Sequence, residues 1–412
     1  MPSISATWSR WKRSRRRARS LPARSSRGPE RPIRSVRAPL GDPEQIADFF
    51  ASFGASLPIG TLADDDGVRV GLIPQRLNRH TFWCGQSGSG KTYALGVALE
   101  QILLNTRLPM VIFDPNSDFV RLGETLPDVA PEVAEQITKR GVRVLRRGQG
   151  PDGLRARLRT MDIASQGALL RLDPVIHRDE FHAMMRHNPT RPIGDPRDLA
   201  ADLAASDDPG AQALGQRMEN LGFFDWDIWA LDHEAATDVV DQRPAATVLD
   251  LGSLARQEEQ LTIALSVLND LWSRREERRP VLLVIDEAHN LCSPDLQSPL
   301  GRAVRDRVIQ IAAEGRKYGL WLLLSTQRPS KVHVGIVSQC DNLTLMRMNS
   351  PNDLAELGDL FGFVPRQLLA QSSRFRQGEA LLAGGFVPAP TVTKIAARMT
   401  VEGGVDVKVP MP

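Results

Sequence analysis

From about residue 80 onward, short runs of apolar residues alternate with stretches in which apolar residues recur at helical spacing. The run "TFWCG" leads into a glycine-rich loop, and the following "KTYALGVALEQILLN" places Leu95, Leu99 and Ile102–Leu103 on one helix face. The run "PMVIFDP" is a continuous apolar strand that ends on Asp114 and its proline. Such strands are typical of parallel sheets covered on both faces, so the sequence predicts an α/β fold with a mainly parallel sheet flanked by helices.

The alternation changes between residues 150 and 243, where helical stretches alternate with turns marked by proline and glycine. We interpret 150–243 as a helical insertion. Strands and helices then alternate again, and "GEALLAGG" at 378–385 is a candidate last strand. The predicted layout is a short N-terminal segment at 41–80, a core at 81–390 that contains the insertion, and a C-terminal tail at 391–412.

Charge is distributed unevenly along the 412 residues, although the net charge is only +3. Residues 1–40 hold twelve Lys/Arg and one acid, a net charge of +11, which leaves −8 for the rest. The composition of 1–40 predicts disorder. This segment could be a basic arm that contacts nucleic acid or an acidic partner, a solvated tail, or translated upstream sequence. Because the rest is mildly acidic, overall charge does not indicate nucleic-acid binding.

Other features of the sequence bear on the compartment. No uninterrupted apolar stretch is long enough to span a membrane, and the basic N-terminus lacks the apolar segment of a secretory signal. The three cysteines, Cys84, Cys292 and Cys340, are far apart and form no metal-binding spacing. We therefore expect a cytoplasmic protein without a membrane partner.

The segment "GQSGSGKT" fits a phosphate-binding loop placed between a strand and a helix. Its glycines allow backbone N–H groups to face phosphates at a helix N-terminus. Lys91 is expected to reach the β- and γ-phosphates of ATP, and the Thr92 hydroxyl to bind Mg²⁺. The residues expected to contact the nucleotide are Gly85, Gln86, Ser87, Gly88, Ser89, Gly90, Lys91, Thr92 and Tyr93.

Two further apolar strands end on polar residues. "PVLLVIDEAHN" ends on Asp286, expected to order the Mg²⁺ shell, and Glu287, expected to act as general base on the attacking water. "LWLLLSTQRPS" ends near Gln327, which could hydrogen-bond the γ-phosphate or the water. Ligands bind at the carboxyl ends of parallel strands, so these residues should share a site with the loop.

Arg316 lies at the end of a predicted helix in "AAEGRKYG". A cation there is explained by the helix dipole, and equally by a finger that reaches a neighbouring subunit's nucleotide. Other ATPase and GTPase classes do not fit. The letters "DEAH" at 286–289 occur without the paired-arginine glycine motif of two-domain helicases, and the "LSGGQ" of transporters and "NKxD" of GTPases are absent.

Taken in order, six blocks resemble the HerA/FtsK superfamily of ring-shaped DNA-pumping ATPases, and most of all its HerA branch. The resemblance covers roughly residues 59–390 and implies a RecA-like P-loop (ASCE) ATPase fold. The blocks are "LNRHTFWCGQSGSGKT", "VIFDPNSDF", "VLLVIDEAHNL", "IAAEGRKYGLWLLLSTQRPS", "VSQCDNLTLMRM" and "GEALLAGG".

The resemblance also implies roles for individual residues. Family members form hexamers with nucleotide sites between subunits, and Arg316 matches the arginine supplied in trans. Arg79 matches a second basic position near the nucleotide, Gln327 the sensor glutamine, and Asp114 the acid at the end of the second strand. The family's second-strand motif usually continues to a glycine and a glutamate, where this chain has Ser117 and Asp118.

These features lead to a main hypothesis, an ATP- and Mg²⁺-dependent translocase or helicase-like motor that acts on duplex DNA as a homo-oligomeric ring. Family members often dock a nuclease through a small N-terminal β-barrel, of which 41–80 is expected to be a reduced remnant. One alternative is an ATP-gated ring scaffold that activates a nuclease or another effector. Another is a secretion-coupling ATPase, which would need a membrane anchor or docking partner.

Overall fold

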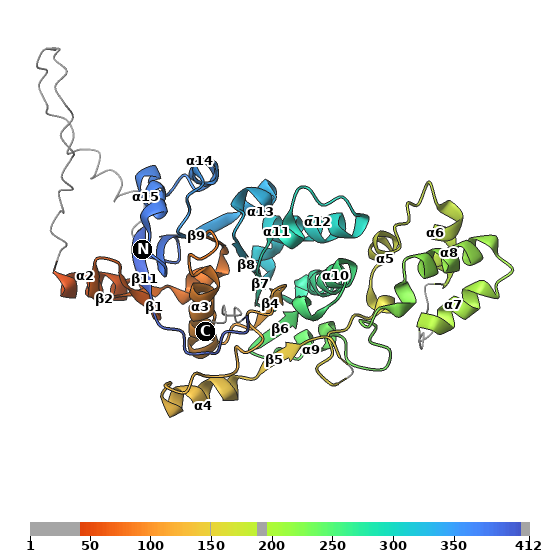
Figure 1. Cartoon of the computed structure of the whole chain (residues 1–412), viewed down its shortest axis with the longest axis horizontal. Helices are drawn as coiled ribbons and strands as arrows, with labels where there is room; N and C mark the ends of the chain where they lie inside the picture. Colours follow the sequence, from red (N-terminus) through yellow and green to blue (C-terminus); the bar gives the residue numbers. More distant parts are fainter. Residues whose placement is uncertain (1–41, 149, 188–195, 405–412) are drawn as a thin grey trace, which may run out of the picture. The chain divides into compact units, whose positions relative to one another are not determined.

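A computed structural model describes residues 42–148, 150–187 and 196–404. The Arg-rich segment 1–40 and the last part of the C-terminal tail, 405–412, lie outside the described residues. Figure 1 shows a central sheet with helices on both of its faces. None of the helices in the described part is long and apolar enough to cross a membrane.

Seven parallel strands form one side of an 11-stranded sheet, from β9 to the edge strand β5. Several of them, including β3 and β7, are buried along their whole length, which explains their continuous apolar sequence. In spatial order the seven strands are β9 (Cys340–Met346), β3 (His80–Cys84), β8 (Leu320–Thr326), β7 (Val281–Ile285), β4 (Met110–Asp114), β6 (Ala246–Asp250) and β5 (Val142–Leu145).

Four antiparallel strands extend the sheet beyond β9. They are β10 (Glu379–Gly384), β11 (Thr391–Ile395), β1 (Leu57–Leu62) and β2 (Asp65–Leu72). The expected tail at 391–412 thus begins with a strand, and segment 41–80 contributes strands to the main sheet. The sequence signal for β11 was only five residues, "TVTKI", too short to distinguish a strand from a tail.

Alternate strand residues supply two hydrophobic cores, one on each face of the sheet. In β4, Val111 and Phe113 belong to one core, and Met110 and Ile112 to the other. The first core packs against α10 (Gln257–Ser273), α11 (His289–Cys292), α12 (Pro299–Glu314), α13 (Val334–Val337), α14 (Pro351–Leu360) and α15 (Arg366–Gln371). The second packs against α2 (Pro43–Ser52), α3 (Lys91–Asn105) and α4 (Pro131–Arg140).

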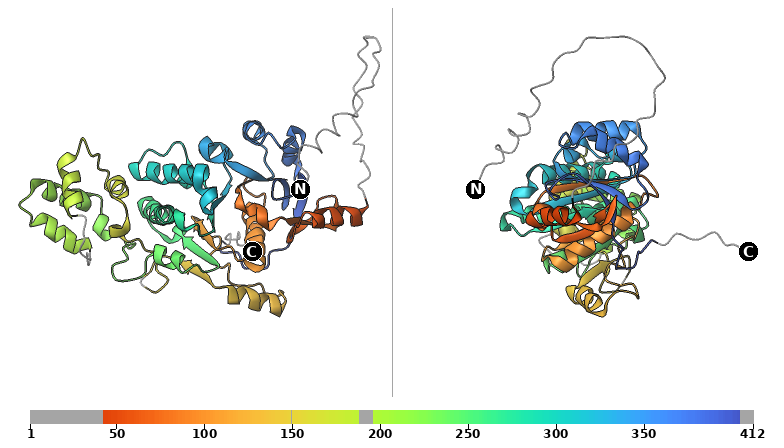
Figure 2. Two further views of the ribbon diagram at one scale, coloured as in Figure 1. Left: turned by 180° about the vertical axis from the view of Figure 1, so that it is seen from behind. Right: turned by 90° about the vertical axis from the view of Figure 1, so that its left-hand side faces the viewer.

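Helices fill the segment that we interpreted as an insertion. They are α5 (Ile163–Leu169), α6 (Arg178–His187), α7 (Pro196–Ala204), α8 (Pro209–Asn220) and α9 (Ala236–Asp241). Helices α6, α7 and α8 cluster together, as Figure 1 and the left view of Figure 2 show. Trp226 and Trp229 stack at 5.9 Å between ring centroids and are buried in the core, where they anchor this segment.

Candidate nucleotide-binding site

The phosphate-binding loop connects β3 to α3, in the strand–loop–helix order that the motif requires. Gly88 and Gly90 have φ angles of 71° and 87°, which side-chain-bearing residues rarely adopt. A Cβ on Gly85 would lie 2.7 Å from Met346 Cβ, so no side chain fits there. Seven of the nine predicted contact residues line a cavity of about 890 Å³, while Gly85 and Ser89 lie buried behind them.

Lys91 is buried at the floor of this cavity. Its Nζ donates to Asp286 Oδ1 and to Ser325 Oγ, both at 2.9 Å, and lies 3.2 Å from Glu287 Oε1. Burial alone would lower the pKa of Lys91, but the charges of Asp286 and Glu287 outweigh burial and raise it. The lysine is therefore a fixed cation, held by both acids that follow β7.

Glu287 is held by three side chains. Gln327 Nε2 donates to its Oε1 at 2.8 Å, His289 Nδ1 lies 3.2 Å from its Oε2, and Lys91 completes the set. Burial raises the pKa of Glu287, but the bond from His289 and the charge of Lys91 outweigh burial and lower it to about 2. The residue has a φ of 42°, a left-handed conformation that is unfavourable for glutamate and often found at functional sites. Its carboxylate is ionised at neutral pH.

Strand order explains why these side chains meet. Strand β8 lies between β3, which leads into the phosphate-binding loop, and β7, which leads into the two acids. All three strands are parallel, so their carboxyl ends reach the same edge of the sheet. Gln327, the residue after β8, therefore lies beside Glu287, on the same carboxylate oxygen that Lys91 approaches.

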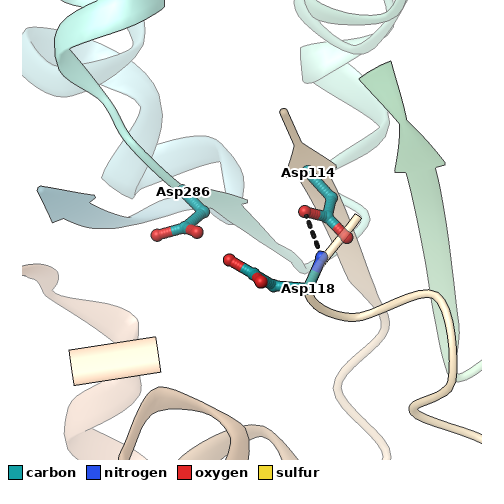
Figure 3. Close-up of side chains that lie close together, drawn as sticks. All are labelled: Asp114, Asp118 and Asp286. Carbon is teal, nitrogen blue, oxygen red and sulfur yellow. Dashed lines mark hydrogen bonds between the residues drawn. The ribbon is translucent and has the colours of Figure 1, made fainter. Parts of the chain in front are cut away.

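Three aspartates gather at this edge of the sheet, as Figure 3 shows, and one of them, Asp286, contacts Lys91. Asp114, Asp118 and Asp286 each offer a carboxylate oxygen, and these oxygens lie within 4.8 Å of one another. Asp114 accepts backbone hydrogen bonds from Asp118 at 3.0 Å and from Phe119 at 2.8 Å. These bonds fix the turn after β4 that directs Asp118 toward Asp286 (Figure 3). Asp114 is thus a buried support beneath the cavity, and Asp118 is the residue that lines it.

The aspartates fit a divalent cation. Burial raises the pKa of Asp114 to about 7 and that of Asp118 to about 6, where repulsion from Asp286 adds to the effect. Asp286 Oδ2 is buried and has no hydrogen-bond partner among the described residues. An orphaned carboxylate oxygen beside two other carboxylates suits Mg²⁺, which prefers oxygen ligands. Thr92 lines the same cavity.

Arg316 and Arg79 lie together, away from these residues. Both approach Asp341: Arg316 forms an ion pair with its Oδ2, and Arg79 Nη1 lies 3.9 Å from the same atom. All three side chains are more than one-third exposed. Neither arginine is among the described residues that line the nucleotide cavity of this chain. The structure thus places Arg79 beside Arg316.

Sequence comparisons agree with this architecture. The family model described as the central domain of the helicase HerA matches residues 57–180. A DNA double-strand break repair helicase HerA of Sulfurisphaera tokodaii is 30% identical over 170 residues, covering 39% of this chain and 34% of that protein. The HerA of Saccharolobus solfataricus is 24% identical over 393 residues, covering 88% and 73%. Residues 57–180 are thus similar to the central domain of HerA, and they contain the loop of a P-loop ATPase.

Solved structures share the fold of this chain. VirB4 of Thermoanaerobacter pseudethanolicus aligns with a TM-score of 0.56 at 17% identity, covering 84% of this chain and 97% of that one. The bacterial conjugative coupling protein TrwB aligns with a TM-score of 0.52 at 13% identity, covering 88% and 93%. The match to the first curated relatives is shorter, since the chain covers only about a third of their length.

Some residues of this nucleotide-binding site were not foreseen. Ser325 contacts Lys91, and His289 contacts Glu287. The only sequence signal for Ser325 was a polar residue within an apolar strand, and the only signal for His289 was the histidine of "DEAH". The cavity is also lined by residues 394–397, Glu402 and Gly404, which lie at the far end of the chain from the loop. Sequence spacing gives no indication of that contact.

Proposed function

We propose that the protein hydrolyses ATP with Mg²⁺ in a homo-oligomeric ring and uses the energy to move along duplex DNA. The observation that carries this proposal is that Lys91 and Gln327 line the cavity behind the phosphate-binding loop and both contact the ionised Glu287. ATP is the expected nucleotide because the loop, the base and the polar residue at the end of β8 together form the parts that phosphoryl transfer needs.

In this proposal each side chain has a defined task. Lys91 exchanges its bonds with Asp286 and Glu287 for the β- and γ-phosphates when a nucleotide enters. Glu287, released from the lysine and still held by His289 and Gln327, accepts a proton from the attacking water. Gln327 donates a hydrogen bond to Glu287, the proposed general base, and lines the cavity. It can therefore orient the attacking water and change its contacts when the γ-phosphate is lost.

Thr92, Asp286 and Asp118 would hold the Mg²⁺ ion, which, when bound, neutralises charge on the phosphates. Asp114 would keep its structural task and hold the turn that carries Asp118. Two of the aspartates have raised pKa values, so a cation there also relieves the repulsion among the carboxylates.

The position of Arg316 and Arg79 supports a ring. Both guanidinium groups are half-exposed and lie outside their own nucleotide cavity, although phosphoryl transfer benefits from an arginine at the developing charge. A neighbouring copy could supply them. The Asp341 ion pair that holds them is at the surface and contributes little stability, so the arginines can leave it at small cost.

Two segments are candidates for DNA contact, and the first of them includes the first turn of α12. Residues 293–302 and 328–334 adjoin each other, because Lys331 Nζ pairs with Asp295 Oδ2 at 2.8 Å and His333 N donates to Cys292 O. Both follow strands of the central sheet, and they offer Arg302 and Lys331 for phosphate contacts. The relatives named DNA double-strand break repair helicases support DNA as the substrate.

The test is steady-state ATP hydrolysis by the full chain with and without duplex DNA. We expect hydrolysis that DNA stimulates and that Lys91→Ala abolishes. Mixing Arg316→Ala subunits with Lys91→Ala subunits should restore part of the activity, because an interface can then combine an intact cavity with an intact arginine. Absent hydrolysis in the wild type would refute the enzyme, and mixtures with no recovery would refute the arginine in trans.

The effect of duplex DNA on the hydrolysis rate distinguishes the motor from the ATP-gated scaffold. Hydrolysis that is indifferent to DNA, together with co-purification of an effector such as a nuclease, would instead identify an ATP-gated scaffold. Native mass measurement in the presence of an ATP analogue and DNA would report the number of subunits in the same sample.

A further inference from the structure

The segment that follows β11, residues 396–404, crosses α3 and reaches the acids beside the phosphate-binding loop; we call it the strap. At its start, Ala396 N donates to Ile59 O at 2.9 Å. At its end, Gly403 N donates to Asp118 O at 3.1 Å, and a Cβ on Gly404 would lie 2.4 Å from Asp118 Oδ1. The strap therefore connects the outer strands of the sheet to the proposed Mg²⁺ site.

A buried carboxylate anchors the middle of the strap. Glu100, on α3, accepts hydrogen bonds from Met399 N at 3.0 Å and from Thr400 N at 2.7 Å, and a third from the Thr400 hydroxyl at 2.6 Å. Arg398 Nε lies 3.7 Å from the same carboxylate, and both side chains are at most 1% exposed. Three donors and a cation on one carboxylate make a strong attachment for an irregular segment.

The sequence of α3 accommodates this attachment. Gly96 faces the strap, and a Cβ there would lie 2.7 Å from Arg398 Cζ, so glycine leaves room for the guanidinium group. Arg398 also lies over the ring of Phe119, 5.8 Å from its centroid. Glycine in the middle of a helix costs stability, and here it allows the arginine to pack against the helix that begins at Lys91.

The strap also faces the nucleotide cavity. Ala396 and Ala397 line it beside the loop that carries Gln377, since Ile395 N donates to Gly378 O at 2.8 Å, and Arg398 N donates to the Tyr93 hydroxyl at 2.7 Å. Tyr93 lines the cavity and is 38% exposed. A flat ring fits between small side chains and an aromatic edge, with the Gln377 amide as a polar partner.

We propose that the strap forms the wall that binds the base and ribose of the nucleoside triphosphate, and that Glu100 and Arg398 position this wall. The proposal rests on the proposed function, since it takes ATP as the ligand. The phosphates are placed at Lys91 and Thr92 by the helix N-terminus, so the nucleoside extends along the rest of the cavity. That remainder is lined by the strap, by Tyr93 and by the loop around Gln377.

The experiment compares two ligands that share only the phosphate end. The dissociation constants of a fluorescent ADP analogue and of inorganic tripolyphosphate are measured for wild type, Glu100→Gln and Arg398→Ala in the full chain. We expect nucleotide affinity to fall about tenfold, because hydrogen bonds to a charged group are lost, and tripolyphosphate affinity to remain unchanged. Steady-state kinetics should show a raised KM for ATP with kcat nearly constant, and Arg398→Lys should recover part of the affinity.

Arg217→Ala is the matched control, since it breaks a half-buried ion pair with Glu180 in the insertion. It should lower thermal stability without changing either dissociation constant. If the anchor variants fail to fold, Ala397→Leu replaces them, because this exposed position lines the cavity and a neutral side chain adds bulk without repelling phosphate. Wild-type nucleotide affinity in the variants, or equal losses for nucleotide and tripolyphosphate, would overturn the proposal. Binding without hydrolysis in the wild type would overturn only the proposed function.

Discussion

Replacing Asp118 with asparagine should stabilise the fold and weaken its response to Mg²⁺. Asp118 is half-buried, and burial followed by repulsion from Asp286 raises the pKa of its carboxyl from 3.8 to about 6. Its carboxylate accepts no hydrogen bond from the other described residues, so the substitution with asparagine breaks no hydrogen bond. The substitution removes one of three crowded carboxylates and leaves the turn held by Asp114 intact.

The magnitude follows from the pKa of Asp118. A rise of this size corresponds to about 3 kcal/mol for a carboxylate shielded from water. Solvent screens a half-buried group, so we expect about 1.5 kcal/mol of added stability in the variant. The folded state holds the proton more tightly than the unfolded state, so the cost of the wild-type carboxylate is complete above about pH 6. It vanishes below about pH 4, where both states are protonated.

Urea unfolding of the wild type and Asp118→Asn measures this difference. The variant should be more stable at about pH 8 and equal to wild type at about pH 4. Mg²⁺ should reduce the stability difference between variant and wild type at the higher pH, because it binds the folded wild type through the intact aspartate cluster. Asp128→Asn, an exposed change on the same connection after β4, should do nothing. A destabilised variant, or a lead that persists in acid, would refute the reasoning.

Three further outcomes are expected. Glu287→Gln should lower kcat by roughly 100-fold or more while nucleotide still binds, measured by single-turnover hydrolysis; a loss below tenfold would exclude Glu287 as the base. Arg302→Ala and Lys331→Ala should each raise the DNA concentration needed for half-maximal stimulation and reduce the salt slope by about 1, measured by titration at several salt concentrations; identical slopes would remove these loops from the DNA path. All three cysteines are buried, and burial raises their thiol pKa values, so a thiol reagent should modify none until the protein unfolds; rapid reaction of the native protein would contradict the packing.

The main site could be predicted from the sequence because its residues carry local signals. Lys91 follows a recognisable loop, and Glu287 and Gln327 each follow a buried apolar strand. Parallel strands present their carboxyl ends at one edge, so three separate segments imply one cavity. The parallel sheet itself was predictable for the same reason, since its strands are continuous apolar runs.

The rest depends on contacts that spacing along the chain does not reveal. Asp118 enters the cavity because Asp114 accepts backbone bonds that shape the turn, which is a property of folded geometry. The strap is an irregular segment with no apolar period, and its attachment to Glu100 joins residues about 300 positions apart. Arg79 carries no local signal that would place it beside Arg316. Tertiary contacts of this kind override what a sequence window can indicate.

Strand β8 links the two halves of the proposed interface site. Arg316 lies shortly before its first residue, Leu320, and Gln327 follows its last, so the strand spans about 23 Å between them. His80 reinforces the first end, because its Nε2 donates to Ala312 O at 3.0 Å and its Nδ1 accepts from Leu322 N at 2.9 Å. Burial, followed by the charge of Arg316, lowers the pKa of His80 to about 4, so the ring is neutral near pH 7 and keeps both bonds.

A strand bonded on both sides cannot stretch, so a backbone shift of Gln327 that pulls on β8 after loss of a γ-phosphate must either break the ladder or move the strand. Moving β8 carries the end of α12 with it through His80, and Arg316 follows that helix. Breaking the surface ion pair between Arg316 and Asp341 costs at most about 1 kcal/mol. Breaking the hydrogen-bond ladder of β8 would cost much more, so the strand moves instead. In a ring, the state of one cavity would therefore reach the arginine that serves the next, which is the coupling that ordered hydrolysis around a ring requires.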